Sequence, residues 1–183
     1  MTLFIAFLRG VNVGGRNLVS MKEICHKLTT LGLESVSSYR TSGNILFEVD
    51  MEQDTITDRI QKTLCEFIGK EVKVFLRTST QIQEIVNLDP FSETILDPVK
   101  FFITFTPFRS TEDIRAPLKN PNLDVEVILV RNAEIFSRTY LRKGRYGAPN
   151  KFIETEFKVS ATTRNWNTIT GLKDIIDRDY DLK

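Results

Sequence analysis

The first hydrophobic segment is a continuous apolar run over residues 3–8. A run without alternation is typical of a β-strand that is buried on both faces. After a polar loop, apolar residues recur at helical spacing over residues 21–31, and Ser20 and Glu23 precede them with the spacing of a capping box. The pattern predicts a central strand followed by an amphipathic helix that ends at Gly32.

The next segments predict a hairpin, a second helix and a fourth strand. Residues 35–39 and 44–49 are two short strand-like runs joined by turn residues. Apolar positions over residues 56–68 have helical spacing up to Gly69, and residues 72–77 alternate as in a half-buried strand. The order strand, helix, strand, strand, helix, strand is the split βαβ, or ferredoxin-like, arrangement.

The second half of the chain partly repeats this order. A capping box at Thr80 and Gln83 predicts a short helix, and the aperiodic residues 90–98 mark a boundary. Beyond it we expect strands at 100–106, 124–130 and 134–139, helices near 110 and at 150–157, an extended piece at 158–161 and a final helix. We therefore predict an α+β protein: a ferredoxin-like lobe, residues 1–90, and a second, related α+β lobe with a C-terminal helix, residues 91–183.

Composition narrows the class of protein. The chain has 183 residues, of which 41% are hydrophobic and 27% charged, and this excludes disordered, collagen-like and coiled-coil proteins. With 25 Lys and Arg against 24 Asp and Glu, the net charge of +1 indicates neither nucleic acid nor membrane as a partner. The first apolar run is too short for a signal sequence or a membrane span. We expect a cytoplasmic protein with reduced thiols at Cys25 and Cys65, and the oligomeric state stays open.

Motifs for metals, cofactors and activated nucleophiles are missing from the sequence. His26 is the only histidine, and the two cysteines are too far apart for a C-x-x-C pair. The segment from Gly10 reads G-x-x-x-x-G-R-N, whereas a P-loop needs Lys and then Ser or Thr at its end. We expect no metal and no cofactor, and the sequence assigns no catalytic residue.

Three polar segments carry the residue types that bind an anionic group: residues 9–17, 40–44 and 160–168. We expect Thr162 or Thr163 to cap the final helix, which would leave first-turn amides free for a ligand. The candidate ligand-binding residues are Arg9, Asn12, Gly14, Gly15, Arg16, Ser42, Asn44, Thr163, Arg164 and Asn165. A purely conformational role for the turn residues and a structural role for the helix cap are the alternatives.

Two further features have two interpretations each. Trp166 shares a helical face with Ile169 and Leu172, which favours a core anchor over a platform that stacks on bases. Residues 137–153 hold five cations, two tyrosines and no carboxylate, as in a loop that follows a phosphate backbone. The same segment would also suit a solvated loop balanced by the acidic residues of the C-terminal tail, residues 174–181.

Together, three strings give the chain a family resemblance. FLRGVNVGG at residues 7–15, YRTSGN at 39–44 and ATTRNWNT at 161–168 resemble the signature segments of the bacterial family catalogued as domain of unknown function 1697. Thr41 stands where that family typically has Gln, which is a minor departure. The resemblance implies a cytosolic, cofactor-free α+β protein of ferredoxin-like character, and it implies no activity.

The donor-rich strings lead to one hypothesis and two alternatives. We expect the three loops to converge on one cleft that binds an anionic, phosphorylated ligand, a nucleotide or an RNA segment. The first alternative is a small metabolic enzyme that acts on a phosphorylated or carboxylated substrate, with Ser42 or Glu48 as proton carrier. The second alternative is a structural or interaction protein in which the strings only hold the fold together.

Overall fold

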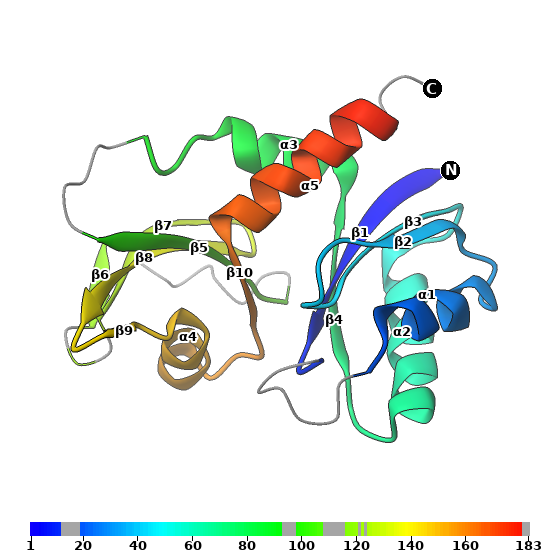
Figure 1. Ribbon diagram of the computed structural model, residues 1–183, viewed down its shortest axis with the longest axis horizontal. Coiled ribbons are helices and arrows are strands. Elements are labelled where there is room, and N and C mark those ends of the chain that lie inside the picture. Colours follow the sequence, from blue (N-terminus) through cyan, green and yellow to red (C-terminus); the bar gives the residue numbers. More distant parts are fainter. Residues whose placement is uncertain (12–18, 93–97, 108–115, 121, 123, 181–183) are drawn as a thin grey trace. The chain divides into compact units, whose positions relative to one another are not determined.

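The computed structural model describes residues 1–11, 19–92, 98–107, 116–120, 122 and 124–180. Two compact units divide the chain, Met1–Ile82 and Gln83–Lys183. Both combine an antiparallel sheet with helices, so the expected α+β class is confirmed (Figure 1). The division lies inside helix α3 (Ser79–Asn87), a few residues before the expected boundary.

The first unit contains a four-stranded sheet and two helices. In chain order its elements are β1 (Thr2–Arg9), α1 (Met21–Thr29), β2 (Glu34–Ser38), β3 (Asn44–Val49), α2 (Gln53–Ile68) and β4 (Lys73–Thr78). The strands lie in the order β2-β3-β1-β4, which places the apolar run of β1 at the centre as expected. This order is compatible with the ferredoxin-like arrangement.

Both helices of the first unit cover the same face of its sheet (Figure 1). Phe4 and Leu8 of β1 alternate onto this face and pack with Ile24 of α1 and Ile60 of α2, all at most 4% exposed. Each such side chain contributes roughly 1.5–3 kcal/mol when it is fully buried. This core holds the ends of β1, β3 and β4 in place.

The second unit contains a larger sheet. Its elements are β5 (Val99–Phe105), β6 (Leu118–Asn120), β7 (Val125–Arg131), β8 (Glu134–Arg142), β9 (Arg145–Tyr146), α4 (Pro149–Phe157), β10 (Thr162–Asn165) and α5 (Trp166–Asp179). The strand order is β10-β5-β8-β7-β6, and β9 pairs with β8. Read from the other edge, the order is β6-β7-β8-β5-β10. Its last four strands, β7-β8-β5-β10, correspond in chain order to β2-β3-β1-β4 of the first unit, and β6 is an additional edge strand.

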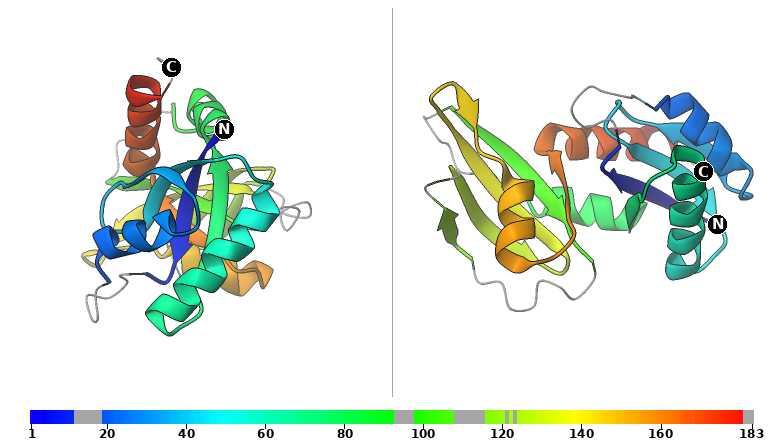
Figure 2. Two further views of the ribbon diagram at one scale, coloured as in Figure 1. Left: turned by 90° about the vertical axis from the view of Figure 1, so that its right-hand side faces the viewer. Right: turned by 90° about the horizontal axis from the view of Figure 1, so that it is seen from below.

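The sheet of the second unit has a helix on each face (Figures 1 and 2). Ile135 of β8 packs with Phe152 and Ile153 of α4. The next residue of β8, Phe136, points to the other face and meets Trp166 at the start of α5, with ring centroids 6.3 Å apart. The helix expected near residue 110 lies outside the described residues.

The start of α3 differs from the expected one because overlapping cap sequences compete. The box that starts α3 is formed by Thr78 and Gln81, not by Thr80 and Gln83: the Gln81 amide donates to Thr78 Oγ1 at 3.2 Å, and the Thr78 amide donates to Gln81 Oε1 at 2.9 Å. Thr78 is the last residue of β4, so the strand passes directly into the helix.

In the described part of the chain, no helix has the length and hydropathy needed to cross a membrane.

Candidate functional site

Two of the three polar loops meet at one end of the first unit's sheet. The Leu8 amide donates to the Gly43 carbonyl at 2.8 Å, so the loop between β2 and β3 lies against the end of β1. Gly43 has φ +72°, and a Cβ at this position would lie 2.9 Å from the Leu8 Cβ. Only glycine fits both the backbone angle and the space, which fixes this loop beside Arg9 and Gly10.

The side chain of Asn44 holds this loop in shape. Asn44 is fully buried, and its Nδ2 donates to the Tyr39 carbonyl at 2.9 Å and to Ser42 Oγ at 3.0 Å. The Ser42 side chain is exposed beside it. Of the two candidate ligand-binding residues in this loop, Asn44 therefore positions the loop, whereas the Ser42 hydroxyl is exposed to solvent.

Cationic side chains surround the place where the two loops meet. Arg9 is half-buried and lies opposite Lys73 of β4 in the strand register. Lys70 Nζ donates to the Gly10 carbonyl at 3.0 Å, and Arg40 lies over the Tyr39 ring at 5.2 Å. The nearby carboxylate of Glu71 lies 3.8 Å from Lys73 Nζ. Four cations and one carboxylate give this end of the sheet a positive formal charge. We call Arg9, Arg40, Ser42, Lys70 and Lys73 the loop-end cluster.

The loop after β1 leads into α1, whose N-terminus adds a partial positive charge. Ser20 caps this helix, because its Oγ accepts a hydrogen bond from the Glu23 amide at 3.4 Å, as the capping box predicts. Four candidate residues of this loop lie outside the described residues: Asn12, Gly14, Gly15 and Arg16. Their role as ligands stays a prediction.

The third polar string has a different local structure from the expected one. Thr162 and Thr163 belong to strand β10 and do not cap the final helix; the cap is Asn165, whose side chain accepts from the Asn167 amide at 3.0 Å. Arg164 is only 7% exposed, and its Nη1 donates to Thr162 Oγ1 at 2.7 Å and to the Thr163 carbonyl at 3.0 Å. Burial lowers the pKa of Arg164 to about 10.

Thr163 connects three elements of the second unit. Its hydroxyl donates to Asn150 Oδ1 of α4 at 3.0 Å and lies 2.8 Å from Thr104 Oγ1 of β5. With one proton per hydroxyl, Thr104 is the donor to Thr163. The contacts described for Thr163 and Arg164 thus lie within the second unit and support its packing.

Trp166 lies in an aromatic cluster of the second unit, as its helical spacing indicates. Its ring meets Phe91 edge-on with centroids 4.9 Å apart, and Phe91 in turn lies 4.5 Å from Phe101. Phe136 completes the cluster. Edge-on contacts such as those of Trp166 with Phe91 and Phe136 are a geometry that aromatic rings prefer in protein cores. The Trp166 indole therefore serves as a core anchor.

The basic segment after residue 137 includes strand β8 and its hairpin with β9, and two of its arginines pair with carboxylates in β7 or directly before it. Arg138 Nε donates to Glu126 Oε2 at 2.8 Å, and Arg142 Nε lies 2.8 Å from Asp124 Oδ1. In the described part of the acidic tail, Asp177 pairs with Lys173 of the same helix and accepts a hydrogen bond from Gln83 Nε2 at 3.0 Å. For Arg138 and Arg142, pairs with Glu126 and Asp124 therefore take the place of the expected balance between loop and tail.

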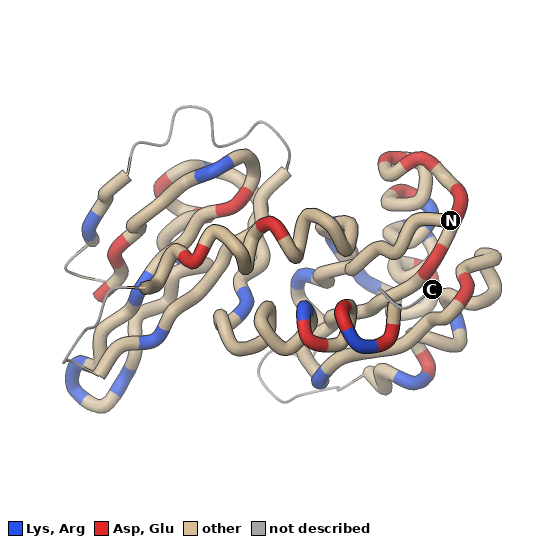
Figure 3. Tube along the Cα trace, turned by 90° about the horizontal axis from the view of Figure 1, so that it is seen from above, with Lys and Arg blue, Asp and Glu red and all other residues tan. Residues whose placement is uncertain are grey.

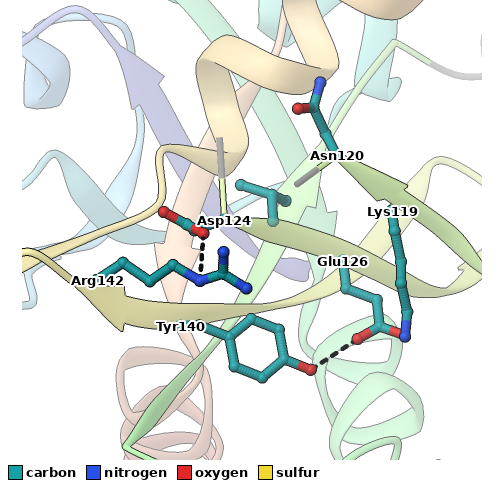
Figure 4. A pocket seen from close by; sticks show the side chains of 7 residues that line it. Lys119, Asn120, Asp124, Glu126, Tyr140 and Arg142 are labelled. Carbon is teal, nitrogen blue, oxygen red and sulfur yellow. Dashed lines mark hydrogen bonds and ion pairs between the residues drawn. The ribbon is translucent and has the colours of Figure 1, made fainter. Parts of the chain in front are cut away.

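A pocket of about 300 Å³ opens beside these cross-strand pairs (Figure 4). We call it the β7–β8 pocket; it is lined by Lys119, Asn120, Asp124, Val125, Glu126, Tyr140 and Arg142. Burial alone would raise the pKa of Glu126, but hydrogen bonds from Arg138, Tyr140 and Lys119 outweigh it and lower the pKa to about 2. Burial and the bond to this carboxylate raise the pKa of Tyr140. Sequence reasoning missed the pocket, because its residues meet only through strand register.

Two observations on the described residues concern the enzymatic alternative. No group of three His, Cys, Asp or Glu side chains among them is arranged to hold a metal ion. Ser42 Oγ accepts a hydrogen bond from the Asn44 amide, and an amide nitrogen cannot take up the serine proton as a general base. His26 is exposed on α1.

Comparisons with known proteins agree with this fold and assign no activity. The model of the family described as "Protein of unknown function (DUF1697)" matches residues 1–136. A conserved bacterial protein from Streptococcus pneumoniae, SP0830, has a similar structure with a TM-score of 0.70 and 22% sequence identity, over 97% of this chain and 99% of that chain. At this identity the similarity shows the fold alone. No curated protein sequence matches the chain.

Proposed function

We propose that this chain, which belongs to the DUF1697 family, binds an anionic ligand at the loop-end cluster: a phosphorylated small molecule, a nucleotide or an RNA segment. The observation that carries the proposal is the hydrogen bond from Leu8 to Gly43, which joins two of the strings that mark the family. Arg9 and Ser42 are thereby held at the same end of one sheet.

The chemistry of the cluster supports an oxyanion over other ligands. Guanidinium and ammonium groups bind phosphate and carboxylate oxygens by charge-assisted hydrogen bonds, and Ser42 adds a neutral donor. Arg40 is exposed and stacks on the Tyr39 ring, whereas Lys70 donates to the Gly10 carbonyl and holds the loop. Arg40 is therefore the side chain with the most freedom to meet a ligand.

The wider site is part of the same proposal. Asn12, Gly14, Gly15 and Arg16 continue the loop from Gly10 and would add backbone and side-chain donors. In the second unit, Thr163, Arg164 and Asn165 stay candidate ligand-binding residues because of their donor chemistry. A cytoplasmic location belongs to the proposal as well, in keeping with the free thiols of Cys25 and Cys65.

A structural role for the strings is the competing function, and the buried contacts of Asn44 and Thr163 favour it for those two residues. Salt dependence separates the two functions, because displacement of counterions makes polyanion binding weaken steeply as salt rises. If the strings only stabilise the fold, no polyanion binds and there is no salt-dependent affinity to measure.

The test is a calorimetric titration with pyrophosphate and with a short single-stranded RNA at 50 and 300 mM salt. We expect saturable binding that weakens with salt, and a loss of about tenfold in affinity in Arg40→Gln. Arg59→Gln is the matched control, because Arg59 is exposed on α2 of the same unit and its substitution removes the same charge. Equal affinities of the two variants, or no binding of either probe, would contradict the proposal.

A further inference from the structure

The β7–β8 pocket of the second unit has the size and wall of a small-molecule site. Its volume of about 300 Å³ lies at the lower end of the range for such sites, roughly 300–1,000 Å³. The ring of Tyr140 lies between Arg142 and Glu126 along one side (Figure 4). The Tyr140 hydroxyl donates to Glu126 Oε2 at 2.8 Å, which fixes the orientation of the ring.

The inner carboxylate of the pocket is already neutralised. Glu126 is 6% exposed and receives Arg138 Nε and the Tyr140 hydroxyl on Oε2, while Lys119 Nζ lies 3.1 Å from Oε1. Lys119, Glu126 and Arg138 are partners in the register of β6, β7 and β8, so the sheet itself sets their spacing. An incoming anion would therefore not meet an uncompensated negative charge here.

Cationic groups remain available at the mouth of the pocket. The side chains of Lys119 and Arg142 are 69% and 64% exposed. Arg142 directs Nε towards Asp124, and among the described residues no partner occupies its two terminal amino groups. Three cations and two carboxylates, with Arg138 included, leave a formal charge of +1. The exposed turn that follows adds Lys143 and Arg145. Figure 3 shows that both signs of charge are distributed over the described trace, with basic and acidic positions in each unit.

We propose that the β7–β8 pocket binds a small hydroxylated oxyanion, namely a sugar phosphate or a sugar acid. The oxyanion lies between Arg142 and Lys119, because the terminal amino groups of a guanidinium form paired hydrogen bonds with such an anion. The sugar ring packs against Tyr140, and its hydroxyl groups donate to the Asp124 carboxylate at the edge of the pocket. This site is separate from the loop-end cluster, and either one can fail without the other.

The competing ligand is a plain inorganic ion, and the structure argues against it. A phosphate ion uses the two exposed cations alone and leaves the aromatic wall and the Asp124 carboxylate without a function. A nucleic acid strand is a second competitor, since the adjoining turn is basic, but a pocket of about 300 Å³ has the size for one small ligand and not for a continuous phosphate backbone.

The test is a calorimetric titration of the full chain with four probes: ribose 5-phosphate, gluconate, ribose and inorganic phosphate. We expect ribose 5-phosphate or gluconate to bind at least tenfold more tightly than phosphate and ribose, and the stronger of the two identifies the source of the oxyanion. Arg142→Gln should lower that affinity about tenfold. Arg145→Gln should change it less than twofold, because Arg145 pairs with Arg142 in the hairpin but does not line the pocket.

Three results would overturn the proposal: no binding of either hydroxylated oxyanion, binding of phosphate as tight as that of ribose 5-phosphate, or equal affinities in the two arginine variants. Lys119→Gln provides a second variant if Arg142→Gln folds poorly, and its expected loss is again about tenfold. Arg40→Gln should leave these affinities unchanged, which separates this pocket from the loop-end cluster.

Discussion

Replacing Glu126 by glutamine removes the carboxylate that pairs with Arg138, Tyr140 and Lys119. The pKa of Glu126 is lowered from 4.5 to about 2. At 1.36 kcal/mol for each pKa unit, folding gains about 3 kcal/mol from this ionised group at neutral pH. Because its pKa is lower in the folded state, the contribution is complete above about pH 4.5 and is lost as the pH falls towards 2.

We therefore expect Glu126→Gln to lower the free energy of unfolding by about 3 kcal/mol at pH 7 and by only about 1.5 kcal/mol at pH 3. Urea denaturation of both proteins at the two pH values measures this difference. Glu66→Gln, at an exposed position on α2, is the control and should stay within about 0.5 kcal/mol of the wild type. The reasoning would be refuted if the difference in free energy of unfolding between wild type and Glu126→Gln were equal at pH 7 and pH 3. A difference no larger than that of the Glu66→Gln control would refute it as well.

Three further substitutions test the packing of the candidate residues by the same urea measurement. Gly43→Ala should cost about 2–3 kcal/mol, because both its positive φ and the 2.9 Å approach to Leu8 oppose a Cβ, whereas Gly32→Ala, with positive φ but open space, should cost about 1 kcal/mol. Equal losses would show that the contact is unimportant. Asn44→Ala should cost about 1–3 kcal/mol, since the Tyr39 carbonyl and the Ser42 hydroxyl lose the donor that holds the loop; a neutral effect would contradict its positioning role. Thr163→Val should cost about 1–2 kcal/mol through the lost hydroxyl contacts. An unchanged stability would contradict its role in packing.

The periodic elements could be predicted from the sequence because local pattern determines them. The uninterrupted apolar run of β1, the alternation in β4 and the helical spacing in α2 match the observed elements within a few residues. Gly69 ends α2 with φ +76°, as glycine after a helix indicates. The strand order of the first unit is compatible with the split βαβ arrangement, whereas β6 and β9 of the second unit were not predicted.

The final polar string was harder to predict because two structures compete for it. A threonine before a helical pattern suits an N-cap, but threonine also favours strands, and pairing with β5 extends the strand to Asn165. Asn165 then takes over the cap. This pairing depends on a partner about 60 residues away, which no local window of sequence contains.

The β7–β8 pocket could not be predicted for a similar reason. Glu126 stands among apolar residues in β7, and a carboxylate in such a strand was the one available signal. Its partners Lys119 and Arg138 come from the neighbouring strands, and β6 has only three residues. Register between strands, not spacing along the chain, brings the three charges together.

The most direct test of anion binding at the loop-end cluster is a nuclear magnetic resonance titration of isotope-labelled protein with pyrophosphate. Backbone amide shifts report the binding place residue by residue, without any substitution. The account predicts saturable shifts at Gly10, Ser42 and Gly43 that shrink as salt rises. No shift at these amides, or shifts confined to the second unit, would contradict the central claim.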